Sequence, residues 1–209
     1  RNPREDLLTT IANATLGEKP LSQSYLDGSW LLIIFAGNDT TRNSLSGTIR
    51  LLTEFPEQRQ MVLDDPSFIE RMSHEALRMV SPVMHMRRTA MEDTEIAGQR
   101  IAKDEKVIMW YGAANRDPSV FPNPDQFDMM RDNVDKHLAF GHGVHRCLGN
   151  RVAQLQLKMA YERILERFPN IYWTGKQKIE PIILVHAISS LQVNLYGKDG
   201  KRPIMVATS

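Results

Sequence analysis

The chain has 209 residues, of which 42% are hydrophobic and 24% are charged, and its formal net charge is +1. This composition is typical of a globular protein long enough to bury a core, and it gives no reason to expect binding to nucleic acid or to a membrane surface. The longest apolar run covers residues 30–36, which is too short to span a bilayer.

The first part of the chain predicts a short helix and a turn over residues 1–22, and then a long helix that ends near residue 55. Ser22 or Ser24 can cap the long helix, and apolar residues at 26, 30, 33 and 34 fall on one helical face. Its middle holds the segment AGNDTT, residues 36–41. A glycine and two threonines lower helix stability, so we expect a distortion there or a misassigned helix. The plain alternative is a few polar residues on a solvated helix face.

Shorter helices follow. Pro56 ends the long helix, and residues 56–66 predict a short helix and a loop. Residues 68–80 carry apolar side chains at helical spacing and predict the next helix. Within it Glu75 and Arg78 lie three residues apart, on one face, where they can form an ion pair. Such pairs are common, and an exposed one contributes little to stability.

Alternating segments after Pro82 predict short strands over residues 83–89, 94–97, 100–101 and 106–111, with a hairpin turn at Gly98. Arg88 carries a guanidinium that can bind a carboxylate bidentately, although it could equally be a surface strand residue, and Arg87 competes for the role. Residues 114–124 are rich in proline and predict an irregular segment. Residues 148–168 predict a helix that Pro169 stops, and the tail over 171–206 has strand-like runs at 182–185 and 191–196.

The segment FGHGVHRCLGNR, residues 140–151, carries Cys147, the single cysteine of the chain. It could be a buried structural thiol, a nucleophile or a ligand. Glycines before and after it let the backbone pass close to something flat and bulky, and the start of a helix favours a thiolate. His145 lies two residues away, but neighbours in sequence rarely give the geometry of a Cys/His pair. One cysteine and no export signal near the start predict a reducing cytoplasm.

These motifs, in this order, resemble those of the cytochrome P450 family. The cysteine segment matches the ligand loop of that family, and AGNDTT matches its oxygen-activation motif. The resemblance implies a mainly α fold with small β-sheets, in which a central long helix, a Glu-x-x-Arg helix, a meander, the Cys ligand loop and a following helix form the C-terminal half of the cytochrome P450 fold. Members of the family are about twice as long. We therefore expect residues 1–209 to be the C-terminal haem-binding part of a single domain, with the N-terminal half outside this sequence.

The resemblance also assigns residues to roles around haem b. Cys147 is the axial ligand of the iron, Asp39 and Thr40 are the catalytic residues that supply protons to dioxygen, and Arg88 and His145 bind haem propionates. The residues expected beside the porphyrin are Ala36, Gly37, Phe140, Gly141 and Gly149. A network for folding and haem retention comprises Glu75, Arg78 and Arg131. The residues expected to face substrate are Val83, Met84 and His186.

The activity implied is that of a monooxygenase, which takes electrons from a ferredoxin served by an NAD(P)H-dependent ferredoxin reductase. Lys136, Arg146 and Arg151 could form a basic docking rim for the ferredoxin or be ordinary solvated charges. The motifs look most like those of soluble bacterial alkane and fatty-acid terminal hydroxylases, with terpene and sterol hydroxylases close behind, which implies an apolar aliphatic substrate. His85 and His186 are polar exceptions. The alternatives are a haem-binding sensor or catalytically silent relative, and a helical module without cofactor.

Overall fold

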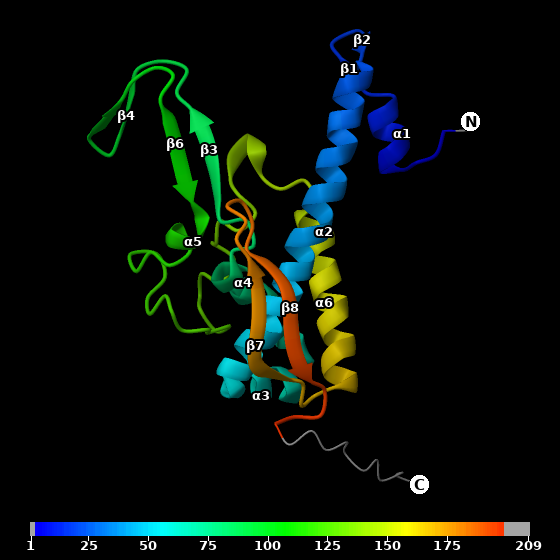
Figure 1. The fold of residues 1–209 in the computed structure, drawn as a ribbon, viewed down its shortest axis with the longest axis vertical. Helices are drawn as coiled ribbons and strands as arrows, with labels where there is room; N and C mark the ends of the chain where they lie inside the picture. The colour runs from blue at the N-terminus through cyan, green and yellow to red at the C-terminus, as the bar shows by residue number, and fades with distance from the viewer. Residues whose placement is uncertain (1–2, 199–209) are drawn as a thin grey trace. The chain divides into compact units, whose positions relative to one another are not determined.

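The structure, a computed structural model, describes residues 3–198. The chain divides into two compact units, residues 1–39 and 40–209. The first unit contains α1 (Leu7–Ala12), the two-residue strands β1 (Thr15–Leu16) and β2 (Lys19–Pro20), and the first part of α2 (Gln23–Glu54) (Figure 1). Asp6 caps α1, because its carboxylate accepts from the amide of Thr9 at 2.7 Å.

Helix α2 confirms the predicted long helix. Ser22 is the residue that caps it, since its hydroxyl accepts from the amide of Tyr25 at 3.3 Å. The helix continues through residues 36–41 without a break, so the expected distortion is wrong. In a helix of 32 residues the propensity cost of one glycine and two threonines is spread over many hydrogen bonds. The hydroxyl of Ser44 also donates to the carbonyl oxygen of Thr40 at 2.8 Å, which satisfies it within the helix.

The second unit has its core between the end of α2 and three helices, α3 (Pro56–Asp64), α4 (Ile69–Val80) and α6 (Asn150–Arg167). Helix α4 follows a single 3-10 turn, η1 (Pro66–Phe68). Gly47 allows α2 to lie close to α4, because a Cβ at that position would come within 2.5 Å of a Val80 methyl group. Tyr161 ties α6 to α2 by donating its hydroxyl to the carbonyl oxygen of Leu45 at 2.5 Å. The core side chains include Leu51, Leu52, Met72, Ala76, Leu157 and Tyr161.

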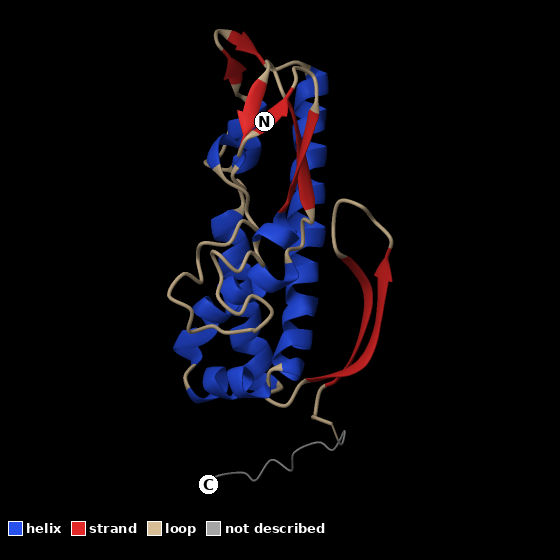
Figure 2. Ribbon diagram, turned by 90° about the vertical axis from the view of Figure 1, so that its left-hand side faces the viewer, coloured by secondary structure: helices blue, strands red, loops and turns tan. Residues whose placement is uncertain are grey.

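The described strands pair as four separate two-stranded antiparallel sheets, which Figure 2 shows in red. In the second unit, β3 (His85–Thr89) pairs with β6 (Lys106–Trp110), β4 (Thr94–Ile96) with β5 (Gln99–Ile101), and β7 (Tyr172–Glu180) with β8 (Ala187–Asn194). A short helix, α5 (Tyr111–Ala114), follows β6, and the 3-10 turn η2 (Gly143–His145) lies in the long irregular segment before α6. The chain is thus mainly α with small sheets, as expected.

The predicted helices over 68–80 and 148–168 and the strands between residues 83 and 111 are confirmed within a few residues, and Gly98 turns the β4–β5 hairpin with φ +81°. The strand expected at 182–185 is wrong: these residues connect β7 to β8, and only Val185 forms an isolated bridge, to Val83. The sequence did not predict strand β7 or helix α5. Residues 199–206 of the expected tail lie outside the described residues. Within residues 3–198 no helix is both long enough and apolar enough to cross a membrane.

Candidate functional site: the cysteine loop and its supports

The ion pair of α4 is buried, so the alternative of an exposed, weak pair is wrong. Glu75 and Arg78 have no exposed side-chain surface, and the two carboxylate oxygens of Glu75 accept from Arg78 at 2.8 Å each. One of these oxygens also accepts from Arg131 at 2.9 Å and from the amide of Asp128 at 2.9 Å. A single carboxylate therefore links α4 to two points of the irregular segment before the cysteine.

The two arginines direct their remaining donors to backbone carbonyl groups. Arg78 donates to the carbonyl oxygens of Asn115, Pro124 and Gln126 at 2.7, 2.8 and 3.0 Å. Arg131 donates to the carbonyl oxygens of Pro122, Asn123 and Gln126. Buried carbonyl groups outside helices and strands need such partners. The network therefore holds an irregular backbone in a single shape.

The cysteine loop has a defined backbone conformation. The amide of Cys147 donates to the carbonyl oxygen of Phe140 at 2.8 Å, which closes residues 140–147 into a loop. Gly141 and Gly143 both have φ +68°, in the left-handed region that side chains other than glycine rarely occupy. Helix α6 begins three residues after Cys147. The thiol is exposed, so the alternative of a buried structural cysteine is wrong.

Apolar side chains close to Cys147 in the sequence are also exposed. Val144 is 98% exposed, Leu148 82% and Val152 61%. A Cβ added at Gly143 or Gly149 would meet no heavy atom of the described residues within 4 Å, so there is open space beside both positions. An exposed sulfur donor with exposed apolar residues near it in the sequence fits a flat, apolar group that binds a metal through a thiolate. A haem has this shape and chemistry, so the residues fit the expected cofactor.

Two residues expected to bind propionates lie on exposed parts of the second unit. His145 is exposed in η2. Arg88 is half-buried in β3 and donates to the carbonyl oxygen of Arg87 at 3.0 Å. Since side chains alternate along a strand, Arg88 points to the same face of β3 as Met86, and Arg87 points to the opposite face.

The residues expected to face substrate come together on one short ladder. Val83 forms an isolated bridge with Val185, and the amide of Met84 donates to the carbonyl oxygen of Leu184 at 3.0 Å. The amide of His186 donates to the carbonyl oxygen of Pro82 at 2.9 Å. Burial lowers the pKa of His186, so its ring is neutral near pH 7.

A residue that sequence analysis missed fixes this ladder from α2. Asn43 is fully buried, and its side-chain oxygen accepts from the amide of Ile188 at 2.8 Å. It lies three residues after Thr40 in α2. Four α2 residues have expected roles. Ala36, Gly37 and Asp39 belong to the first unit, and Thr40 begins the second.

Another missed residue joins the ion-pair network to the segment just before the cysteine loop. Asn115 is fully buried; its side-chain oxygen accepts from the amide of Leu138 at 2.7 Å, and its nitrogen donates to the hydroxyl of Ser81 at 2.9 Å. Asparagine is common in turns, so position 115 gave no signal of a buried role.

Comparison with known proteins supports a common origin for the whole arrangement. The sequence model of the family described as "Cytochrome P450" matches residues 1–185. Linalool 8-monooxygenase of Pseudomonas putida is 40% identical over 197 residues, which are 94% of this chain and 48% of that protein. Steroid C26-monooxygenase of Mycobacterium tuberculosis is 35% identical over 191 residues, 91% of this chain and 51% of that protein.

Solved structures agree. Cytochrome P450-153 from Novosphingobium aromaticivorans has 42% sequence identity and a TM-score of 0.77, over 87% of this chain and 44% of that one. The chain spans about half the length of the curated relatives it matches.

Proposed function

The chain belongs to the cytochrome P450 family, and on this premise we propose that the protein is a haem-thiolate monooxygenase with Cys147 as the axial ligand of haem b. The observation that carries the proposal is the exposed thiol of Cys147, held in a loop closed by the Phe140 carbonyl and followed by the exposed apolar residues Leu148 and Val152. The extent of the relatives supports the further proposal that residues 1–209 are the C-terminal haem-binding part of a single domain.

Each part of the loop has a proposed task. A bound haem supplies the activation of dioxygen and the insertion of one oxygen atom into a C–H bond, which thiolate ligation promotes. Phe140, Gly141 and Gly149 would lie beside the porphyrin, and a Cβ at Gly149 would meet no heavy atom of the described residues within 4 Å, so there is room at that position. Arg88 and His145 would bind the propionates, because a guanidinium can take a carboxylate bidentately and an imidazole N–H can donate to one.

Residues of α2 are proposed to handle the protons. Thr40 can both donate and accept through its hydroxyl, so it can hold a proton next to dioxygen. Asp39, its neighbour in the chain, can take a proton from solvent and return it to the hydroxyl. Ala36 and Gly37 carry little or no side chain, which keeps this part of the helix narrow. Cleavage of the dioxygen bond consumes protons, and this pair would deliver them.

The test of the central proposal is spectroscopic. The haem-loaded protein should give the thiolate-type spectrum of its reduced carbon monoxide complex, and Cys147→Ser and Cys147→His should both lose it. His142→Ala, a change at an exposed position of the same loop, is the matched control and should keep it. An unchanged spectrum in both cysteine variants would remove Cys147 as ligand. Product formed from dioxygen and reductant distinguishes a monooxygenase from a haem sensor or silent relative, which would bind haem without turnover.

We propose an apolar aliphatic substrate, of medium chain length or terpenoid. Val83 and Met84 are apolar, and the neutral ring of His186 adds no charge. The names of two relatives, a linalool and a steroid monooxygenase, point the same way. Titration with linear alkanes, fatty acids and monoterpenes should shift the haem spin state. A shift with a polar sugar or an aromatic compound, and with none of these three, would overturn the assignment.

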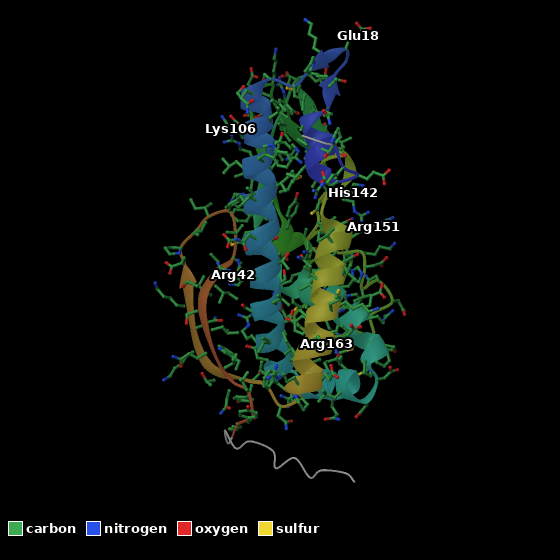
Figure 3. All side chains as sticks on the ribbon, turned by 90° about the vertical axis from the view of Figure 1, so that its right-hand side faces the viewer. Glu18, Arg42, Lys106, His142, Arg151 and Arg163 are labelled. Carbon is green, nitrogen blue, oxygen red and sulfur yellow. The ribbon has the colours of Figure 1, made fainter. Side chains whose placement is uncertain are left out.

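The proposed electron donor is a small acidic ferredoxin, reduced by an NAD(P)H-dependent reductase in the cytoplasm. Lys136, Arg146 and Arg151 are exposed near the cysteine loop, and Figure 3 shows Arg151 and His142 together at the N-terminal end of α6. Long-range attraction between opposite charges speeds association and is screened by salt. Arg146→Glu should therefore slow reduction by ferredoxin most at low salt. Reduction that is indifferent to both charge and salt would exclude this docking surface.

A further inference from the structure

Two histidines connect α4 to the cysteine loop. Nδ1 of His74 lies 3.2 Å from Nε2 of His137, and Nε2 of His74 lies 3.4 Å from Nε2 of Gln154 on α6. The amide of Ala139 donates to Nδ1 of His137 at 3.3 Å. The His137 ring also packs against Phe140, with 5.8 Å between the ring centroids. The side chains thus form a continuous chain from α6 through α4 to the first residue of the cysteine loop.

The hydrogen bonds fix the tautomers of both rings. Nδ1 of His137 accepts from a backbone N–H, so in the neutral ring the proton is on Nε2. That Nε2–H can donate only to an unprotonated nitrogen, so Nδ1 of His74 accepts and the proton of His74 is on its Nε2. The structure places Nε2 of Gln154 nearest to His74, so the amide must turn by 180° for its oxygen to accept this bond, and the two ends of an amide have the same shape. With the amide turned in this way, every donor in the chain has an acceptor.

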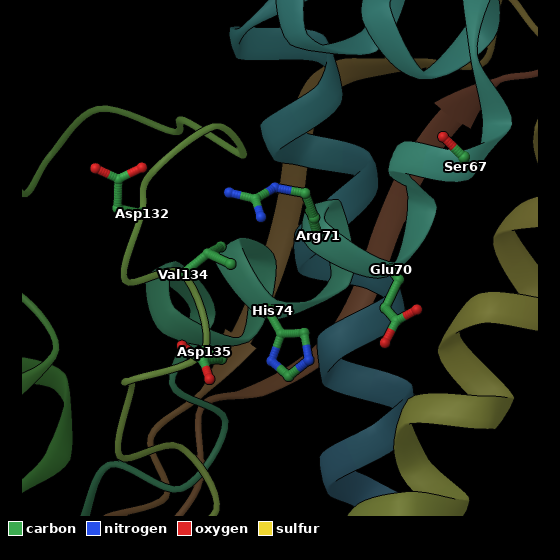
Figure 4. Close-up of a pocket in the computed structure, with 7 residues that line it drawn as sticks. All are labelled: Ser67, Glu70, Arg71, His74, Asp132, Val134 and Asp135. Atoms are coloured by element: carbon green, nitrogen blue, oxygen red, sulfur yellow. The ribbon is translucent and has the colours of Figure 1, made fainter.

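The surroundings keep both rings neutral. Burial lowers the pKa of His137 to about 3, and the neighbouring His74, Arg78 and Arg146 act in the same direction. Burial also lowers the pKa of His74, and Arg71 adds to this, whereas Asp135 and Glu70 oppose it. Figure 4 shows His74 and these neighbours around a polar cavity of about 440 Å³, lined by Ser67, Glu70, Arg71, His74, Asp132, Val134 and Asp135.

We propose that His74 and His137 are positioning residues for the cysteine loop: the directed chain from Ala139 N–H through both rings to Gln154 holds Phe140 in place. Phe140 in turn accepts the hydrogen bond from the Cys147 amide at 2.8 Å, so its position sets that of the sulfur. This inference rests on the proposed function, because it concerns Cys147 as the ligand of haem. It assigns to the two histidines a role distinct from that of the buried ion pair.

Two substitutions at residue 74 separate the hydrogen bond from the packing. Asparagine places an acceptor oxygen near the position of Nδ1, so His74→Asn should keep the bond from His137. His74→Leu fills the site but leaves the buried Nε2–H of His137 without an acceptor, which destabilises this arrangement. Ser73→Ala is the control, because Ser73 is buried on the same helix and its hydroxyl bonds only to the Ile69 carbonyl.

The experiment follows the haem-loaded protein as its reduced carbon monoxide complex changes from the thiolate type to the type without thiolate. We expect about tenfold faster conversion in His74→Leu, equivalent to about 1.4 kcal/mol, and conversion near the wild-type rate in His74→Asn and Ser73→Ala. Equal rates in His74→Leu and His74→Asn would overturn the inference. If the wild-type protein never shows the thiolate-type spectrum, the proposed function is wrong, and the inference is then wrong as well.

A second measurement does not depend on how the variants fold. Nitrogen NMR of histidine side chains in the wild-type carbon monoxide complex should show His74 and His137 both neutral at pH 7, each with its proton on Nε2. A proton on Nδ1 of either ring would contradict the directed chain, even where the substitutions change the spectrum as expected.

Discussion

Neutralising Glu75 tests the buried network directly. In Glu75→Gln the side chain keeps its shape but loses the charge that the Arg78 and Arg131 guanidinium groups face at 2.8 and 2.9 Å. Both arginines then stay buried, at 0% and 8% exposure, with only carbonyl oxygens as the partners described above. Removing one member of a buried ion pair typically costs about 3–5 kcal/mol, because the remaining charge has lost both water and its counter-ion. We expect a loss of that size in the free energy of unfolding.

The chain contains a matched control for this change. Glu166 accepts from Arg163 at 2.9 Å with the same spacing of three residues, but the two side chains are 68% and 83% exposed. Glu166→Gln should therefore cost less than about 1 kcal/mol. Urea unfolding of the haem-loaded protein measures both, and a shift of midpoint at constant slope reports stability alone. A loss at Glu75 below about 1 kcal/mol, or equal losses at the two positions, would refute the argument that burial makes this network important.

Four further predictions concern single side chains. Thr40→Ala should keep haem and substrate binding but release reducing equivalents as peroxide, measured as product formed per NAD(P)H consumed; wild-type coupling would exclude the proton role. Asn43→Ala should weaken the substrate-induced spin shift and speed hydrogen exchange of the Ile188 amide, whose partner is lost; unchanged exchange would show that the clamp is absent. Gly47→Ala should cost about 1–3 kcal/mol by overpacking against α4, and a neutral or stabilising result in thermal unfolding would contradict that close approach. The pKa of His137 is lowered from 6.5 to about 3, so between these pH values the unfolded chain binds a proton that the folded chain does not. The free energy of unfolding should therefore be highest above about pH 6.5 and fall by up to about 1.4 kcal/mol per pH unit below it. A His137→Gln variant with an equally steep fall would exclude this residue as the cause.

Periodicity predicted the helices well and the tail badly. The apolar spacing of residues 68–80 recurs at 3.6 residues and survives as α4. The segment over 172–180, in contrast, contains Gly175 and the charged residues Lys176, Lys178 and Glu180, so it lacks the alternation that marks a half-buried strand. It is a strand because it pairs with β8, with register irregularities on the way. Pairing of this kind depends on tertiary contacts, which local sequence does not contain.

The candidate site was predictable to different extents. Spacing alone predicts that Glu75 and Arg78 can pair, but burial and the carbonyl partners come from a loop some 40 residues further on. The contact between His74 and His137 joins positions 63 residues apart and has no periodic signal. The roles of Cys147 and Thr40 rest on motif resemblance and stay predictions until the haem-loaded protein is measured.

Helix α4 carries, on consecutive residues, the two side chains that hold the irregular segment before the cysteine. His74 and Glu75 point about 100° apart around the helix axis. His74 faces His137, which precedes the cysteine loop, and Glu75 accepts from Arg131 and from the amide of Asp128. Few backbone hydrogen bonds within the irregular segment belong to the regular ladders of a helix or a strand. A long loop of this kind needs hydrogen-bond partners from other elements to be ordered. The ion-pair network of Glu75 fixes the first part of that segment, and the contact of His74 with His137 fixes its end, just before the cysteine loop. Loss of the charge at Glu75 should therefore appear first in global unfolding, whereas loss of the acceptor at His74 should appear first in the state of the thiolate.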